Sequence, residues 1–148
     1  GMNVAAADKN MDSTEVIVEF FNGESVKVSI DTISIEEVLK TSDFISLHVP
    51  AQKEYVIGSK EFGMMKEGAI IINAARGGVI DEVALVDALD NNKLTFAALD
   101  TFENEPKPEI KLLMHPKISL TPHIGAATLE AQDRIGVELG QQIISIIR

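Results

Sequence analysis

The chain has 148 residues, of which 45% are hydrophobic and 24% are charged, and its formal net charge is −10. This length and composition are those of one folded domain with a proper core, and no apolar run reaches the roughly 20 residues of a membrane span. The acidic balance argues against a nucleic-acid or anionic-membrane partner, and the absence of cysteine excludes disulfides and fits a cytoplasmic protein.

The first part of the chain predicts a β-hairpin. Residues 3–7 form a short apolar run that stops at Asp8, which is typical of a strand ending in an acidic residue. Residues 14–30 alternate on both sides of Asn22-Gly23, the dipeptide that favours a tight turn between antiparallel strands. A helix over the first half of this stretch is the competing interpretation, but its valine, isoleucine and phenylalanine residues favour strands.

Beyond Ser34 the pattern becomes an alternation of helices and strands. Ser34 followed by Glu37 resembles a capping box at the start of a first helix. The predicted strands then cover residues 44–49, 69–73, 95–99 and 118–120, and the predicted helices cover residues 61–65, 82–91 and 128–147. This alternation predicts an α/β fold built on a doubly wound parallel sheet with flanking helices.

The run around residues 70–81 contains a candidate anion site. Three consecutive isoleucines, residues 70–72, predict a strand buried on both faces. Arg76 then stands directly before Gly77 and Gly78, which permit a tight loop at the sheet edge. A guanidinium there suits two-pronged binding of a carboxylate or phosphate. A surface arginine paired with a nearby carboxylate is the alternative.

Polar residues follow the ends of several predicted strands, and ligands of open parallel sheets bind at that edge. They are Asp8, His48, Arg76, Asp100 and His123, with Glu103 and Glu105 in the loop after Asp100. Asp8 has an alternative interpretation as a capping or turn residue, and His48 has one as a residue that makes a structural hydrogen bond. His123 lies between Pro122 and Ile124-Gly125, which hold its imidazole in a set direction.

Several ordered motifs together resemble one family. They are Asn-Ala-Ala-Arg-Gly-Gly-Val-Ile-Asp-Glu at 73–82, Ala-Leu-Asp-Thr-Phe-Glu-Asn-Glu-Pro at 98–106, Leu-Thr-Pro-His-Ile-Gly-Ala at 120–126, and the segments 42–50 and 1–4. In this order they resemble the NAD-dependent D-isomer-specific 2-hydroxyacid dehydrogenases, most closely the D-3-phosphoglycerate dehydrogenases. The resemblance covers nearly the whole chain except residues 14–33.

The resemblance implies a role for each matching position. Arg76 holds the substrate carboxylate and the C2 oxygen, His123 is the acid/base, and Glu105 hydrogen-bonds its imidazole. Asp8 binds the adenosine ribose, and Asp100 approaches the nicotinamide carboxamide. The full set of expected NAD-binding residues is Asp8, His48, Val49, Pro50, Ala74, Ala75, Arg76, Asp100, His123 and Gly125. No metal is expected.

The chain also departs from the family. The G-x-G-x-x-G turn that cradles the pyrophosphate does not occur in it. We therefore expect residues 1–127 to form a partial NAD-binding domain without the first strand and glycine loop, and 128–148 to form a helix returning toward a substrate domain. The expected function is that of a portion of a dehydrogenase acting on a D-2-hydroxy acid. The first substrate to expect is 3-phosphoglycerate, an intermediate of serine biosynthesis. We expect this chain alone to be inactive or weakly active. A homodimer is expected; the alternative is a catalytically silent module for dimerisation or partner binding.

Overall fold

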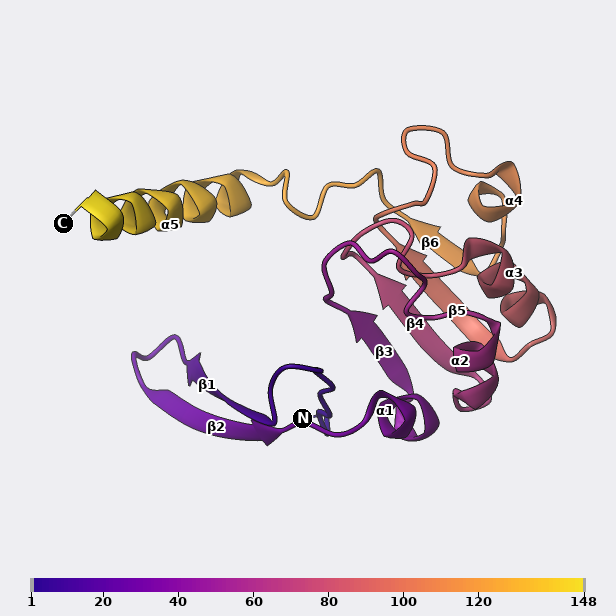
Figure 1. The fold of residues 1–148 in the computed structure, drawn as a ribbon, viewed down its shortest axis with the longest axis horizontal. Coiled ribbons are helices and arrows are strands. Elements are labelled where there is room, and N and C mark those ends of the chain that lie inside the picture. Colours follow the sequence, from indigo (N-terminus) through magenta and orange to yellow (C-terminus); the bar gives the residue numbers. More distant parts are fainter. Residues whose placement is uncertain (1, 148) are drawn as a thin grey trace.

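The computed structural model describes residues 2–147, and the sheet at its centre has four parallel strands. They are β3 (Phe44–Leu47), β4 (Ala69–Asn73), β5 (Leu94–Leu99) and β6 (Ile118–Leu120), hydrogen-bonded in the order β3-β4-β5-β6. Because every neighbouring pair is parallel, all carboxyl ends meet at one edge of the sheet (Figure 1). The predicted α/β class is confirmed.

One helix leads into β3, and one helix connects each pair of consecutive strands in the sheet. They are α1 (Ile35–Thr41), α2 (Ser59–Met64), α3 (Glu82–Asp90) and the short α4 (Ile110–Leu113), which the sequence pattern missed. Ser34 caps α1 by accepting a hydrogen bond from the Glu37 N–H, as the capping-box pattern predicts. Asp81 caps α3 by accepting from the Ala84 N–H at 3.0 Å.

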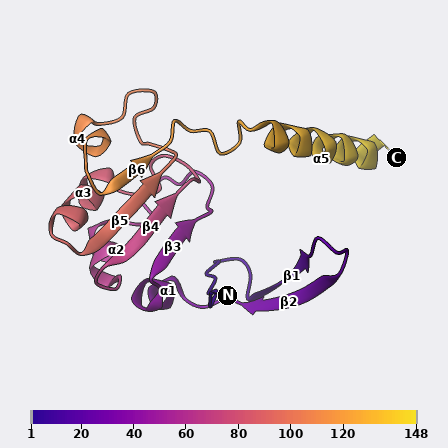
Figure 2. The same ribbon diagram turned by 180° about the vertical axis from the view of Figure 1, so that it is seen from behind.

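Helices α1 to α4 lie on one face of the sheet, as the two opposite views show (Figures 1 and 2). On that face Ile45, Ile71 and Ala97 are at most 5% exposed and join the core. On the other face Phe44 and Phe96 flank Ile70 in register and are 61% and 37% exposed. The expectation that β4 is buried on both faces is therefore wrong for the uncovered face.

The predicted hairpin is confirmed as an antiparallel pair, β1 (Ser13–Glu19) and β2 (Ser25–Asp31), which stands apart from the parallel sheet (Figure 1). Val16 pairs with Val28 and Val18 with Val26, so four valines share one face. The strand predicted at residues 3–7 is wrong. Only Ala6 makes an isolated bridge, to Thr32 just after β2, because this segment does not lie beside the parallel sheet.

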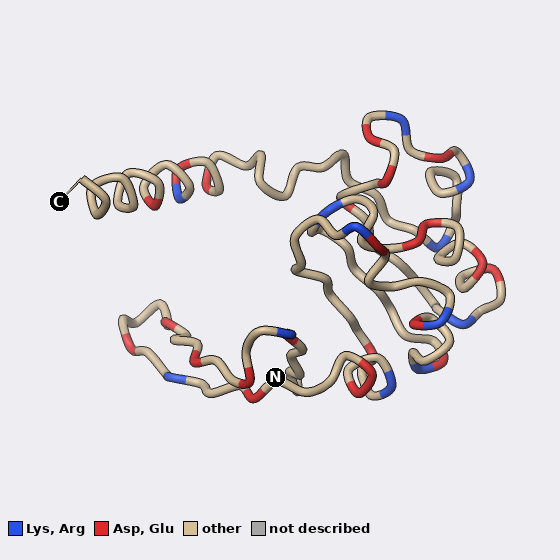
Figure 3. The backbone as a smooth tube through the Cα atoms, viewed as in Figure 1, with Lys and Arg blue, Asp and Glu red and all other residues tan. Residues whose placement is uncertain are grey.

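The last element, α5 (Leu129–Ile147), begins where expected, with Thr128 accepting a hydrogen bond from the Ala131 N–H. It projects away from the sheet, and none of its residues is buried (Figure 2). Within residues 2–147, no helix has the length and apolarity to cross a membrane. Basic residues are spread along the chain among acidic ones (Figure 3). Gly1 and Arg148, the ends of the expected segments 1–127 and 128–148, lie outside the described residues.

Candidate active site

Three neighbouring strand ends bring the expected catalytic residues to one edge. Arg76 follows β4, Glu105 lies in the loop after β5, and His123 follows β6. Because β4, β5 and β6 are adjacent in the sheet, these three loops are neighbours. Parallel sheets bind their ligands at this edge.

His123 and Glu105 form a hydrogen-bonded pair. The imidazole Nδ1 lies 2.8 Å from Glu105 Oε2, and the other carboxylate oxygen accepts from the Phe102 N–H at 2.9 Å. The bond to His123, followed by that from Phe102, lowers the pKa of the Glu105 carboxyl below its ordinary value. Since an ionised carboxylate only accepts, Nδ1 donates the proton in this contact, which leaves Nε2 as the nitrogen available to accept a proton.

The backbone at His123 has φ +54°, in the left-handed region that residues other than glycine seldom adopt. Buried Asp100 holds this loop: Oδ1 accepts from the Thr121 hydroxyl at 2.6 Å and the Ile124 N–H at 2.9 Å, and Oδ2 accepts from the Gly125 N–H at 2.8 Å. Burial by itself raises the pKa of Asp100, but these hydrogen bonds outweigh it and the pKa lies below its ordinary value. Asp100 is thus an anchor for the histidine loop.

Arg76 extends from a loop that Asn73 holds in shape. The Asn73 side chain donates to the Arg76 carbonyl at 2.9 Å and accepts from the Ala75 N–H at 3.1 Å. The next residue, Gly77, touches the neighbouring loop so closely that an added Cβ would lie 1.9 Å from the Phe102 carbonyl oxygen. The loop of Arg76 and the loop of Glu105 are therefore in direct backbone contact, and the Arg76 side chain itself is exposed.

The other expected NAD-binding residues divide into two groups. His48, Val49, Pro50, Ala74, Ala75 and Gly125 all lie in loops after β3, β4 or β6, at the same edge. His48 contacts Ser46 Oγ through Nε2 at 2.9 Å. Asp8 is not brought to this edge, because its segment pairs only near Thr32; its carboxylate accepts from the Asn10 N–H at 2.7 Å.

Sequence reasoning missed how the loops are tied together. Buried Glu82 and half-buried Glu103 each accept a hydrogen bond from the backbone N–H of the other. Asn73 and Asp100 each hold a loop through hydrogen bonds to the backbone of that loop. Asn73 and Asp100 both stand at strand ends, which is a signal for such anchors. Nothing in the spacing of Glu82 and Glu103 indicates their contact.

Residues 1–125 match the family described as D-isomer specific 2-hydroxyacid dehydrogenase, NAD binding domain. The chain belongs to this family. It is 43% identical over 124 residues to D-3-phosphoglycerate dehydrogenase 3, chloroplastic, of Arabidopsis thaliana, an alignment covering 82% of this chain and 21% of that protein. It is 42% identical over 148 residues to the hydroxypyruvate reductase of Thermotoga maritima, covering 97% of this chain and 44% of the relative.

A solved structure gives the same result for the fold. The glyoxylate reductase from Paecilomyes thermophila matches with a TM-score of 0.68 and 42% sequence identity, over 73% of this chain and 34% of that one. The sheet and its helices are thus those of a Rossmann-like NAD-binding domain. The chain spans less than half the length of each of these relatives.

Proposed function

We propose that this chain carries the catalytic residues of an oxidoreductase that transfers a hydride between NAD and a D-2-hydroxy acid. The observation that carries the proposal is the bond of 2.8 Å between Glu105 and Nδ1 of His123. This bond leaves Nε2 as a proton acceptor at the sheet edge where the end of β4, on the other side of β5, supplies Arg76.

The reaction assigns one task to each group. In the oxidation direction the hydroxyl proton of the substrate passes to Nε2 of His123, the C2–H bond breaks, and the C2–O bond becomes a carbonyl. When bound, NAD supplies the hydride acceptor. Glu105 stabilises the imidazolium that forms, and Arg76 neutralises the substrate carboxylate and polarises the C2 oxygen.

The residues present fit the nicotinamide half of the cofactor. Exposed Ala74 and Gly125 have little or no side chain at the strand ends beside Arg76 and His123, so a flat ring can approach the backbone there. We assign His48, Val49, Pro50, Ala75 and Asp100 to the same cofactor site. Asp8 lies away from this edge in the structure, and we assign it to the adenosine ribose on the family resemblance alone. The sequence has no G-x-G-x-x-G turn for the pyrophosphate, so the chain alone is inactive or weakly active.

The proposed substrate is 3-phosphoglycerate, which would place the enzyme in serine biosynthesis. The similarity to an Arabidopsis thaliana D-3-phosphoglycerate dehydrogenase supports this choice. The Thermotoga maritima relative is a hydroxypyruvate reductase, so glycerate and lactate belong in the same substrate panel.

A second candidate function is dimerisation or partner binding without catalysis. The uncovered sheet face and the wholly exposed α5 favour it, since apolar surface of this kind marks contact sites. The two candidates are compatible with a homodimer.

The test is an absorbance assay for NADH with 2-hydroxy and 2-oxo acids. Any activity should fall at least about 100-fold in His123→Ala, because general acid–base catalysis contributes on that order. Arg76→Lys should raise KM and lower kcat together, since lysine lacks the planar two-pronged geometry. Unchanged rates in both variants refute the assigned roles. Because weak activity or none is expected of the chain alone, NAD binding decides between the candidates: binding that calorimetry does not detect favours the non-catalytic one.

A further inference from the structure

Glu82 is a buried carboxyl group that the proposed reaction does not use. It is the first residue of α3 and is 7% exposed. Its Oε1 accepts a hydrogen bond from the Glu103 N–H at 2.7 Å, whereas its buried Oε2 has no partner among the described residues. Burying a carboxyl group with one unpartnered oxygen costs free energy of folding. We therefore ask what the contact between Glu82 and Glu103 contributes to the site.

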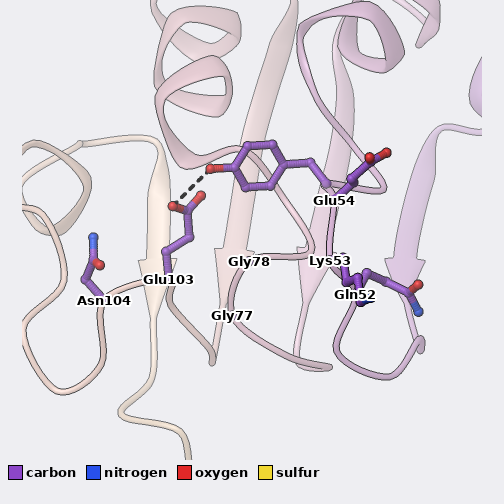
Figure 4. A pocket seen from close by; sticks show the side chains of 8 residues that line it. Gln52, Lys53, Glu54, Gly77, Gly78, Glu103 and Asn104 are labelled. Carbon is purple, nitrogen blue, oxygen red and sulfur yellow. Dashed lines mark hydrogen bonds between the residues drawn. The ribbon is translucent and has the colours of Figure 1, made fainter.

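Glu103 returns the contact. Its Oε1 accepts from the Glu82 N–H at 3.1 Å, and its Oε2 accepts from the Tyr55 hydroxyl at 3.3 Å. The second of these bonds is the dashed line in Figure 4. Two side-chain-to-backbone bonds thus join the start of α3 to the loop after β5, across 21 residues of sequence. Glu103 also borders an open pocket of about 550 Å³ that Gly77 and Gly78 line.

The joined loop is the one that aims Glu105. Glu103 directly follows Phe102, whose N–H donates to Glu105 Oε1 at 2.9 Å, and the other oxygen of Glu105 contacts Nδ1 of His123. The Phe102 carbonyl in turn rests against Gly77, beside Arg76. A shift of the Glu103 N–H would therefore move both the Glu105 contact with His123 and the backbone beside Arg76.

We propose that Glu82 is a positioning residue, which fixes the loop of residues 101–105 so that Glu105 meets Nδ1 of His123. Its value to hydride transfer rests on the function proposed above, but the positioning itself needs neither cofactor nor substrate. Glu82 touches no reacting atom; it acts through the backbone of Glu103.

The required property of Glu82 is an oxygen acceptor at the right place. Burial raises the pKa of its carboxyl group, the bond from Glu103 lowers it, and the charges of Glu103, Glu109 and Glu105 raise it further. Negative charge is therefore disfavoured at this position. A glutamine of the same length keeps the acceptor and removes the charge, so Glu82→Gln should preserve the geometry, whereas Glu82→Ala and the shorter Glu82→Asp should lose it.

The test determines the tautomer of His123 by ¹⁵N-detected NMR of the full chain, without ligands, at about pH 8, which is above the reference pKa of an imidazole in a model peptide. The chain has three histidines, and the spectrum of His123→Gln assigns the signal. The wild type and Glu82→Gln should show the Nδ1–H tautomer. Glu82→Ala should lower the ratio of the Nδ1–H to the Nε2–H form about tenfold, the effect of losing one well-placed hydrogen bond.

Asp81→Ala is the matched control. Asp81 caps the same helix, but its side chain bonds to Ala84 inside that helix, so this variant weakens α3 and leaves the Glu103 contact in place. It should keep the Nδ1–H tautomer. An unchanged ratio in Glu82→Ala, or an equal loss in Asp81→Ala, overturns the proposal. If Glu82→Ala does not fold, Glu82→Asp gives the same decision.

Because this readout uses no substrate, it separates the positioning role from the proposed function. A shifted tautomer in a chain without dehydrogenase activity supports the positioning role and counts against catalysis by the chain alone. An unshifted tautomer in an active enzyme refutes the positioning role and leaves the proposed function standing.

Discussion

Carboxyl groups at this edge of the sheet carry opposite pKa shifts because their oxygens meet different partners. Asp100 and Glu105 each accept several hydrogen bonds, and the pKa of each lies below its ordinary value. Glu82 has one satisfied oxygen and is buried near other carboxylates, which raises its pKa. Hydrogen bonds therefore favour the ionised form of the first two carboxyl groups, whereas burial disfavours the ionised form of Glu82.

The raised pKa of Glu82 predicts a pH-dependent stability difference. Between the ordinary carboxyl pKa and the raised one, the folded chain binds more protons than the unfolded chain, so ionising Glu82 lowers stability as pH rises through that window. Glu82→Gln cannot ionise. It should therefore be more stable than the wild type at about pH 7 and lose this advantage below about pH 4. Urea denaturation at both pH values measures the difference; lower stability of the variant at the higher pH contradicts the prediction.

At the scale of elements, the site depends on backbone contact between loops. Gly77 lies against the Phe102 carbonyl, so any side chain at that position must push the loops after β4 and β5 apart. Gly63 offers a matched control: it lies exposed in α2 with nothing within 4 Å of an added Cβ.

Gly77→Ala should destabilise the fold by about 1–3 kcal/mol or more, the cost of overpacking a close contact. Gly63→Ala should instead stabilise it by about 0.5–1 kcal/mol, because alanine is the better helix former. Equilibrium urea denaturation of both variants gives the two values. If both variants change the free energy of unfolding by the same small amount, the two loops separate freely and the prediction is wrong.

The same contrast explains which elements were predictable. Local patterns were sufficient for the hairpin at Asn22-Gly23, for the cap at Ser34 and for β4, since neighbours in sequence determine them. The pair of hydrogen bonds between Glu82 and Glu103 was not predictable, because it joins two segments that approach only when β4 and β5 pair. The strand expected at residues 3–7 failed for a related reason: an apolar run becomes a strand only beside a partner strand.

At the scale of the whole molecule, the chain exposes more surface than a compact protein of its size. Its accessible area is 10661 Å², whereas a compact monomer of 16.1 kDa has about 7,400 Å². The difference, about 3,000 Å², lies in the range that stable assemblies bury. Exposed apolar residues of α5, such as Ile135, Leu139 and Ile143, contribute to it, and their spacing places them on one stripe of the helix.

This surface predicts self-association through α5. Sedimentation velocity at about 10–100 μM should show dimers or larger species for the wild type, because burying an interface of this class gives micromolar or tighter affinity. The double variant Leu139→Glu with Ile143→Glu should shift the distribution toward monomer, since it places two charges in the stripe. Val137→Glu is the control, because Val137 is 61% exposed on the opposite side of the same helix. A wild type that stays monomeric would overturn the prediction of self-association. Association with equal effects of both changes would exclude the α5 stripe as the contact and direct attention to the open face of the sheet at Phe44 and Phe96.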